Sequence, residues 1–345
     1  MSSSSLSKPE FVKGDCVVGW TVKKKIGSGG FGSVYEVEYE GQRAAMKTEF
    51  VYEDEKGELP NEVKQLRLLQ FSQHFCRLFL ACQSVNDGHC VNIMVMQLVG
   101  KNLSVLRRST PQHRFTSVTA FRLAKQCLQA IQDMHSVGLL HRDIKSSNFA
   151  WSAEERLVYL LDLGFCRRFI KVGEDGQVHH RAARKKAPYK GTAKYSSIDA
   201  SNRQEQGRRD DLWSWLYMTV EFIKGKLKWD GRGEHMQVVL KERIGSRLLD
   251  GCPKKMAPIY DHIKCLKYES RPDYELLHRK LDDFLTEKMV VETDAYDFEK
   301  GGKYWEYCQQ TNDAKTIRPP KDVLDWEPRL TIWSPCEDLS NCDLD

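Results

Sequence analysis

The chain has 345 residues, of which 41% are apolar and 29% charged, and its formal net charge is +5. That length is sufficient for a two-lobed enzyme with an extension, and no stretch approaches the roughly 18 uninterrupted apolar residues that a membrane helix needs. The first residues, MSSSSLSKPE, lack the apolar region of a secretory signal and the arginines of a transit peptide. We therefore expect a soluble protein of the cytosol or nucleus, without a membrane partner.

The cysteine spacing and the distribution of charge further limit the class of protein. The 11 cysteines are an odd number and lack Cys-x-x-Cys spacing, which predicts free thiols in place of disulfides or a zinc site. From Glu292 onward there are 13 acidic and 6 basic residues, a net charge of −7, which leaves +12 for residues 1–291. This asymmetry favours an anionic or phosphorylated partner, or contact between tail and body, although a mixed solvated surface explains it equally well.

Periodicity divides the chain into four parts. Residues 1–14 are rich in serine and predict a mobile leader, whereas 15–97 contain short β-branched runs between glycine turns, which predicts a strand-rich lobe. Residues 98–290 have the longer apolar repeat of helices, and 291–345 form an acidic segment with little periodicity, for which an extended tail is expected. The sequence does not decide whether this tail binds the body, recruits a substrate or only fills space. Helices are predicted at 59–70, 117–137, 209–224, 236–249 and 273–289.

A glycine-rich segment separates two predicted strands, Thr21 to Ile26 and Val34 to Tyr39. Glycines there let backbone N–H groups approach phosphate oxygens, and the strand that follows argues against a dinucleotide fold, in which a helix follows the glycines. A bare glycine match is as often a flexible hairpin turn, so this motif alone is weak. Its candidate nucleotide-binding residues are Gly27, Gly29, Phe31, Gly32 and Val34.

A lysine and a glutamate are the next candidates. Lys47 follows Ala45 and Met46 at the end of an apolar strand, where it can reach the α and β phosphates if a carboxylate holds its ammonium. Glu62, in the first turns of the helix predicted at 59–70, is the candidate for that ion pair. Taken in isolation, such a residue is more commonly a solvated helical glutamate.

The segment LHRDIKSSNF, residues 140–149, contains the most specific motif of the chain. Transfer of a γ-phosphoryl group needs an acceptor hydroxyl aligned with the phosphorus and a group that accepts its proton, which suits the carboxylate of Asp143. Lys145 can neutralise the phosphoryl group during transfer, and its presence favours serine or threonine acceptors over tyrosine. Asn148 can bind a magnesium ion. The three residues predict a catalytic loop.

A second metal-binding candidate follows the strand predicted at Leu157 to Leu161. Asp162 begins the sequence Asp162-Leu163-Gly164 and lies nineteen residues after Asp143. A carboxylate is a hard ligand for a hard cation, so Asp162 is placed to bind magnesium that bridges the β and γ phosphates. Leu163 stands where phenylalanine is usual, which predicts a changed inhibitor response more than a loss of catalysis.

These motifs, in this order, resemble the eukaryotic protein kinase family over about residues 20–290. Their finer detail resembles the casein kinase I superfamily, in which a Ser-Ile-Asn type sequence replaces the usual Ala-Pro-Glu at the end of the activation segment. Within that superfamily the chain is most similar to the tau-tubulin kinase branch. The segments that support these two finer resemblances are Ser197-Ile198-Asp199, residues 207–214 (GRRDDLWS), Gly100-Lys101-Asn102-Leu103, Asn148-Phe149 and Ala295-Tyr296-Asp297-Phe298-Glu299.

The resemblance implies a bilobal α+β fold, with a strand-rich N-lobe that has one main helix and a mostly helical C-lobe. It implies an enzyme that uses ATP and Mg2+ to phosphorylate serine and threonine in proteins, with a hinge at Gln97 to Val99 behind a gatekeeper Met96. It further implies that Asp211 anchors the catalytic loop from the start of a buried helix. We expect a monomer with protein substrates and no nucleic-acid partner. Besides the glycine segment, the nucleotide contacts implied are Ile26, Lys47, Met96, Gln97 and Leu98.

Basic residues around the activation segment are candidate contacts for a substrate anion. Relatives in the casein kinase I superfamily often prefer acceptors near an existing phosphate, and Lys194 matches one basic position that the resemblance implies. At a second such position the chain has Leu240, with Lys241 beside it, which leaves dependence on a prior phosphate open. A basic cluster within the segment can receive an acidic or phosphorylated substrate, but a solvated loop explains it equally well. The cluster consists of Arg181, Arg184, Lys185 and Lys186.

The activation segment lacks the usual site of regulatory phosphorylation. Many kinases are switched on when a phosphorylated serine or threonine in this segment pairs with the arginine before the catalytic aspartate, here Arg142. Between Gly164 and Gly191 the chain has neither serine nor threonine, and Tyr189 has the only hydroxyl. We predict an enzyme that is active without phosphorylation of this segment.

Two substitutions near the end of the segment predict an ion pair. Asp199 stands where the superfamily has asparagine, and Arg271 stands before Pro272, where most other kinases have an ion-pairing arginine. Together these changes predict a salt bridge between Asp199 and Arg271.

Two other classes of function compete with a protein kinase. A kinase-fold scaffold binds nucleotide or a partner without transferring phosphate, but such proteins usually lack one of the catalytic residues, and this chain has equivalents of all of them. A small-molecule kinase is disfavoured by Arg142 and Lys145 together with the long segment that faces the substrate. A transfer assay on proteins discriminates among the three classes.

Overall fold

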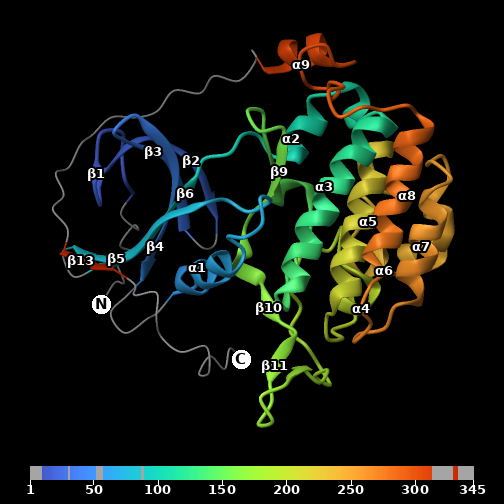
Figure 1. Cartoon of the computed structure of the whole chain (residues 1–345), viewed down its shortest axis with the longest axis horizontal. Coiled ribbons are helices and arrows are strands. Elements are labelled where there is room, and N and C mark those ends of the chain that lie inside the picture. Colours follow the sequence, from blue (N-terminus) through green and yellow to red (C-terminus); the bar gives the residue numbers. More distant parts are fainter. Residues whose placement is uncertain (1–9, 30–31, 52–56, 87–88, 313–328, 333–345) are drawn as a thin grey trace. The chain divides into compact units, whose positions relative to one another are not determined.

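The computed structural model describes residues 10–29, 32–51, 57–86, 89–312 and 329–332. These residues belong to two compact units, both drawn in Figure 1. Unit 1 takes its described residues from Met1–Gln70, Cys76–Leu98 and Arg318–Asp345. Unit 2 takes them from Phe71–Phe75 and Val99–Ile317.

Unit 1 is built on one antiparallel sheet, whose strand order is β1-β2-β3-β4-β6-β5-β13 (Figure 1). Helix α1 (Leu59–Leu68) follows β4 in the chain and contacts β5 and β6. The expected combination of strands with one main helix is therefore confirmed. The strands are β1 (Cys16–Val17), β2 (Trp20–Gly29), β3 (Gly32–Tyr39), β4 (Gln42–Val51), β5 (Leu78–Asn86), β6 (His89–Gln97) and β13 (Arg329–Ile332).

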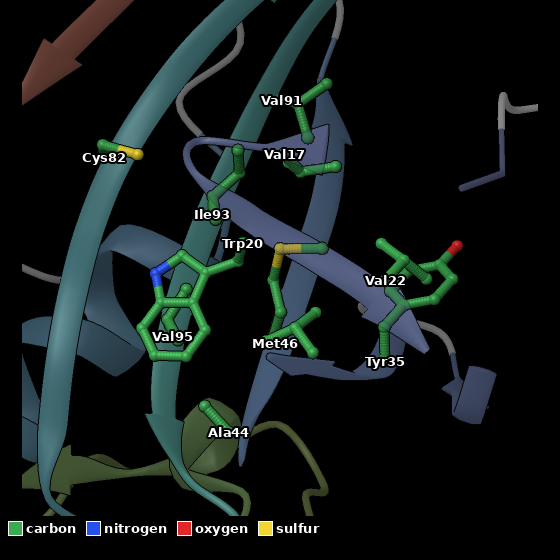
Figure 2. Close-up of a cluster of buried hydrophobic side chains, with 11 residues drawn as sticks. Val17, Trp20, Val22, Tyr35, Ala44, Met46, Cys82, Val91, Ile93 and Val95 are labelled. Carbon is green, nitrogen blue, oxygen red and sulfur yellow. The ribbon is translucent and has the colours of Figure 1, made fainter. Parts of the chain in front are cut away.

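One apolar cluster forms the core of this sheet. Because successive side chains of a strand point to opposite faces, Ala44 and Met46 lie in the cluster while Lys47, the next residue of β4, points to the other face. Figure 2 shows Met46 among the other core side chains. The core therefore fixes the strand that presents the predicted catalytic lysine. Its members are Val17, Trp20, Val22, Tyr35, Val37, Ala44, Met46, Cys82, Val91, Ile93 and Val95.

Unit 2 is mostly helical, as expected. Its helices are α2 (Leu103–Arg108), α3 (Ser117–Ser136), α4 (Ile198–Ser201), α5 (Arg208–Lys224), α6 (Glu234–Ile244), α7 (Met256–Cys265), α8 (Tyr274–Glu287) and α9 (Trp305–Asn312). Short two-stranded ladders pair β7 (Leu139–Leu140) with β10 (Arg167–Arg168), β8 (Phe149–Ser152) with β9 (Leu157–Leu160), and β11 (Ile170–Val172) with β12 (Val178–His180). One-turn 3-10 helices lie at Pro111–His113, Ser146–Asn148, Leu163–Phe165 and Gly245–Leu249.

Helices α3 and α5 form the centre of unit 2. α3 packs against both α5 and α8 (Figure 1), and the indole N–H of Trp215 donates to the carbonyl oxygen of Ala124 at 2.9 Å. Most side chains of α5 are buried, which is typical of a helix enclosed by others. This packing fixes the first turn of α5, where Asp211 lies.

The segment after residue 291 differs from the extended tail that the sequence favoured. Tyr296, Asp297 and Phe298 are 4%, 3% and 6% exposed, and helix α9 follows them. The Asp297 carboxylate accepts hydrogen bonds from the backbone N–H and the hydroxyl of Thr116, at 2.6 and 2.9 Å, at the start of α3. The guanidinium of Arg122 donates to two carbonyl oxygens of the same segment. As far as Cys308, which is 2% exposed, this part of the chain has side chains packed within unit 2.

Three classes of feature are absent from the described ranges. No helix there is long and apolar enough to cross a membrane. No group of three or more His, Cys, Asp or Glu side chains there could hold a metal ion. Each described cysteine is a free thiol, as predicted, while Cys336 and Cys342 lie outside those ranges.

Candidate active site in two units

The described glycines of the predicted segment lie at the end of β2 and the start of β3 in unit 1, and residues 30 and 31 between them are outside the described ranges. The strand register pairs Gly27 with Val34 and Gly29 with Gly32. Gly32 has a φ of +124°, and a Cβ there would lie 1.9 Å from the carbonyl oxygen of Thr48, so a side chain does not fit. The two antiparallel strands that must flank a phosphate-binding loop are present.

The remaining predicted nucleotide contacts also belong to unit 1 and are accessible. Ile26, before the turn, is 44% exposed. Met96 lies opposite Ala45 in the β4–β6 register, so it is on the strand next to the one that carries the predicted lysine. Phe31 lies outside the described residues. Half-buried side chains are found at four predicted contacts: Val34, Met96, Gln97 and Leu98.

Unit 1 contains the predicted lysine–glutamate ion pair. Lys47 Nζ lies 2.5 Å from Glu62 Oε2, and the two residues are 9% and 5% exposed. Lys47 is opposite Val34 in the β3–β4 register, which places it beside the glycine hairpin. Because a buried ion pair is held firmly only while both partners are present, Glu62 restricts the ammonium to one position. An ammonium held at that position can bind a phosphate oxygen.

The catalytic loop of unit 2 is anchored by a buried carboxylate. Asp211 accepts hydrogen bonds from the backbone N–H groups of His141 and Arg142, both at 2.8 Å, and from His135 Nε2 at 3.0 Å. Burial raises the pKa of Asp211, but the hydrogen bonds from the His135 ring and from the backbone N–H of His141 oppose it, and that pKa lies below its usual value. Arg142 has a φ of +67°, a strained conformation for a non-glycine residue that these bonds stabilise.

The predicted base lies at the centre of a polar cluster. Asp143 Oδ2 accepts a bond from Lys145 Nζ at 2.5 Å, and Oδ1 accepts one from the hydroxyl of Thr192 at 2.7 Å. Lys145 Nζ also donates to that hydroxyl at 3.2 Å, and Asn148 Nδ2 donates to the Asp143 carbonyl oxygen at 2.9 Å. The structure therefore brings together Asp143, Lys145 and Asn148 and adds Thr192, which the sequence reasoning missed.

The end of the activation segment lies directly on the catalytic loop. Gly191 has a φ of +118°, and a Cβ there would lie 2.6 Å from the carbonyl oxygen of Arg142. Only glycine permits this approach. The approach brings the next residue, Thr192, to the carboxylate of Asp143.

Asn148 and Asp162 have the chemistry of a site for a divalent cation. The backbone N–H of Leu161 donates to the Asn148 carbonyl oxygen at 2.8 Å, so Asp162 begins next to Asn148. The amide nitrogen of Asn148 is directed at the Asp143 carbonyl oxygen, which leaves the amide oxygen as its metal-binding atom. A carboxylate and an amide oxygen on adjoining segments fit Mg2+, which prefers hard oxygen ligands.

Two of the predicted substrate-anion residues already have carboxylate partners within unit 2. Lys194 Nζ lies 2.5 Å from Glu221 Oε1 and 3.0 Å from Asp230 Oδ1. Arg184 Nη2 donates to Glu205 Oε1 at 3.0 Å. Lys185 is exposed. A substrate anion would therefore have to compete with internal carboxylates at Lys194 and Arg184.

Lys241, beside the position expected to be basic, is a structural lysine. It is 5% exposed and donates to the carbonyl oxygens of Ala193 and Ser196, both at 2.7 Å. Burial lowers its pKa to about 7. Its ammonium joins α6 to the end of the activation segment and does not face solvent.

The predicted salt bridge between Asp199 and Arg271 is wrong. The Asp199 carboxylate is paired with Arg209, and Arg271 is exposed and takes no part in that pair among the described residues. Arg209 lies in the first turn of α5, and its guanidinium also donates to the carbonyl oxygen of Leu266 at 3.1 Å. That bond holds Arg209 in place beside Asp199.

Comparison with known proteins identifies the family. The profile described as Protein kinase domain matches residues 20–291, which is most of the chain, so the chain belongs to the protein kinase family. A probable serine/threonine-protein kinase of Dictyostelium discoideum is 37% identical over 297 residues, which cover 84% of this chain and 58% of that protein. The chain thus spans less than two thirds of the length of that relative.

Two further relatives cover more of their own length. The serine/threonine-protein kinase spe-6 of Caenorhabditis elegans is 32% identical over 81% of this chain and 75% of its own. Casein kinase I homolog 3 of Schizosaccharomyces pombe is 30% identical over 84% of this chain and 68% of its own. The predicted resemblance to protein kinases is confirmed, and a casein kinase I homolog is among the relatives.

Proposed function

We propose that the chain is an ATP-dependent serine/threonine protein kinase. The observation that supports this most strongly is the cluster of unit 2 in which Asp143 is bonded to both Lys145 and Thr192. The names of the relatives and the family support the same activity. We propose that the groups of unit 1 bind the nucleotide and that those of unit 2 carry out the transfer.

The roles of the residues follow from their chemistry. Asp143 accepts the proton of the acceptor hydroxyl as that oxygen binds phosphorus, and Lys145 offsets negative charge on the phosphoryl group. Lys47, held by Glu62, binds phosphate oxygens of ATP. Asn148 and Asp162 would hold Mg2+, which neutralises phosphate charge when bound. Adenine contacts are proposed at Ile26, Val34, Met96, Gln97 and Leu98, and phosphate contacts at the glycine hairpin, including Phe31.

The finer assignment is also a proposal. We place the chain in the casein kinase I superfamily, most similar to the tau-tubulin kinase branch, and the casein kinase I relative supports the first step. The second step rests on residues 100–103, 148–149 and 295–299, and Asp297 of the last segment binds Thr116 at the start of α3. We further propose a monomer of the cytoplasm or nucleus that acts on proteins.

We propose that the substrates are acidic or already phosphorylated near the acceptor residue. Among the candidate contacts, Lys185 is exposed, so a substrate anion can reach it directly. Lys194 and Arg184 become available only if the anion displaces Glu221 or Glu205. A preference for acidic residues is therefore expected to be stronger than a requirement for a prior phosphate.

A transfer assay on an oriented peptide library tests the proposal. The library contains acidic, phosphorylated and neutral members around a central serine or threonine, and casein serves as a protein acceptor. Wild-type protein with ATP and Mg2+ should label casein and favour acidic members, whereas Asp143→Asn should label none. Equal labelling by both proteins, or none by the wild type, would remove the kinase assignment and favour a scaffold.

A further inference from the structure

In unit 2 the side chains of Arg167 and Arg184 lie on the single carboxylate of Glu205, whose charge also acts on a third arginine, Arg142. Arg184 binds Glu205 through two guanidinium nitrogens, with Nη2 3.0 Å from Oε1, and Arg167 Nε lies 3.5 Å from the same oxygen. Glu205 is 6% exposed. Two of the three cations therefore share one buried anion.

Arg142, the residue before the catalytic Asp143, is the third arginine. Its Nε donates to the carbonyl oxygen of Phe165 at 2.7 Å. Burial lowers the pKa of Arg142 to about 10, repulsion from Arg167 and Arg184 acts in the same direction, and Glu205 opposes them. Without the carboxylate, three guanidinium groups would repel one another next to the catalytic loop.

The two ion pairs of Glu205 join segments that are distant in sequence. Arg167 belongs to β10, which pairs with β7 immediately before the catalytic loop, and Arg184 lies in the later part of the activation segment. Glu205 lies between α4 and α5. One carboxylate thus holds together two points of the activation segment, one of them on the strand that pairs with β7 just before the catalytic loop.

In many kinases a phosphate added to the activation segment gathers such arginines. Here no serine or threonine lies between Gly164 and Gly191. We infer that Glu205 is a permanent anion that gathers the arginines in place of such a phosphate. It thereby acts as a positioning residue for the catalytic loop. The inference rests on the proposed kinase activity and gives a physical reason for the predicted independence from phosphorylation in this segment.

Charge-removing and charge-keeping variants of Glu205 test the inference. Wild type, Glu205→Gln, Glu205→Asp and Glu205→Ala are treated with phosphatase, and mass spectrometry confirms that residues 164–197 carry no phosphate. Values of kcat and of KM for ATP are then measured with casein. The matched control is Glu299→Gln, which breaks an ion pair with Arg156, distant in sequence from the activation segment. Thermal unfolding shows which variants are folded.

We expect Glu205→Gln to lower kcat by about 10- to 100-fold, the size of effect seen when one oriented charge is lost, with KM for ATP within about twofold. Glu205→Asp, which retains the charge, should keep most of kcat, and Glu299→Gln should match wild type. For Glu205→Ala, sodium sulfate should restore several-fold more activity than sodium chloride of equal ionic strength, because sulfate can take the vacated position.

Three results would overturn the inference. They are a folded Glu205→Gln with wild-type kcat, a folded Glu205→Asp as impaired as Glu205→Gln, and a Glu205→Ala to which sulfate and chloride give the same activity. If Glu205→Gln does not fold, the aspartate variant and the sulfate measurement decide. Failure of the proposed function is distinguishable, since the wild type itself would then label no casein.

Discussion

The two units position their candidate catalytic groups by different means. In unit 1 the backbone does so: strand register sets Lys47 opposite Val34 beside the glycine hairpin, and one ion pair with Glu62 completes the arrangement. In unit 2 a loop supports the groups, and side chains from distant helices fix it. Asp211 of α5 binds two of its backbone N–H groups, and Thr192 binds the base.

This difference predicts how each unit responds to the loss of a side chain. A sheet tolerates the loss of a side chain while its ladder is intact, so damage in unit 1 should be confined to nucleotide binding and phosphate alignment. A loop held by buried hydrogen bonds depends on every partner, because an unsatisfied buried group is costly. Changes in unit 2 should therefore affect both transfer and folding.

The largest effect on stability is expected at Tyr296, because unit 2 includes the segment beyond residue 291. Its ring packs on Trp151 at 4.6 Å between centroids, and the Arg122 guanidinium lies 3.8 Å from its centre. Tyr296→Ala should lower the free energy of unfolding by about 3 kcal/mol, as for other buried aromatic truncations. Chemical denaturation measures this value. Tyr307→Ala, at a 45% exposed position of α9, is the matched control and should cost little.

The next largest effect is expected in unit 1, at the Lys47–Glu62 ion pair. Lys47→Met and Glu62→Gln should each lower kcat/KM by about 100-fold, because each leaves its buried partner without its counter-ion and misplaces the phosphate contact. The double variant should have a kcat/KM only slightly below that of either single variant, because the two residues function as one ion pair. Steady-state kinetics on casein measures all three. Additive losses would mean that the ion pair is not the functional unit, and Lys64→Met on the exposed side of α1 is the control.

A smaller effect is expected at Thr192 in unit 2. Thr192→Val preserves shape but removes the hydroxyl that binds Asp143 and Lys145, so kcat should fall about tenfold, the value of one hydrogen bond to charged groups. KM for ATP should stay the same, because the proposed nucleotide contacts belong to unit 1. A changed KM with an unchanged kcat would contradict the separation of roles. Thr286→Val, at an exposed position of α8, is the control.

The smallest effect concerns pH and the anchor of the catalytic loop. Burial lowers the pKa of His135 from 6.5, although its bond to Asp211 opposes this, so the folded state keeps this histidine neutral where the unfolded chain is protonated. Stability from this group is present above pH 6.5 and is lost as the pH falls through 6.5 toward the lower pKa of the folded state. His135→Gln should flatten this decline in the unfolding free energy. His235→Gln, at an exposed site, should leave it unchanged, and a decline that persists in His135→Gln would assign it to another group.

Sequence reasoning was most reliable where a role depends on spacing along the chain. The glycine hairpin, the long helices α3, α5 and α8, and the partner of Lys47 could all be predicted, because each follows from periodicity or from a fixed motif. The shorter helices α2, α4, α7 and α9 were missed, since their apolar repeats are too brief to stand out. The sequence left open whether the segment that contains Tyr296 binds the body, because its contacts come from α3 and from the β8–β9 ladder, which are distant in sequence.

Apart from the Lys47–Glu62 pair, which a fixed motif encodes, ion pairs were the least predictable feature. Lys194, Arg184 and Asp199 were each recognised as charged residues of interest, but their partners are Glu221, Glu205 and Arg209. A charged side chain reaches whichever counter-ion the tertiary fold places nearby, and no local pattern encodes that choice. Thr192 could have been suspected only from its place directly after Gly191.

The most direct test of the account separates nucleotide binding from transfer. Wild type and Asp143→Asn are loaded with radiolabelled ATP and Mg2+, the dissociation constant is measured, and a single turnover onto casein is followed by rapid quench. The account predicts that the dissociation constant changes by less than about threefold, while the transfer rate falls by about 1000-fold or more, as expected for loss of a positioned proton acceptor. A transfer rate that survives in Asp143→Asn, or ATP binding lost together with transfer, would contradict it.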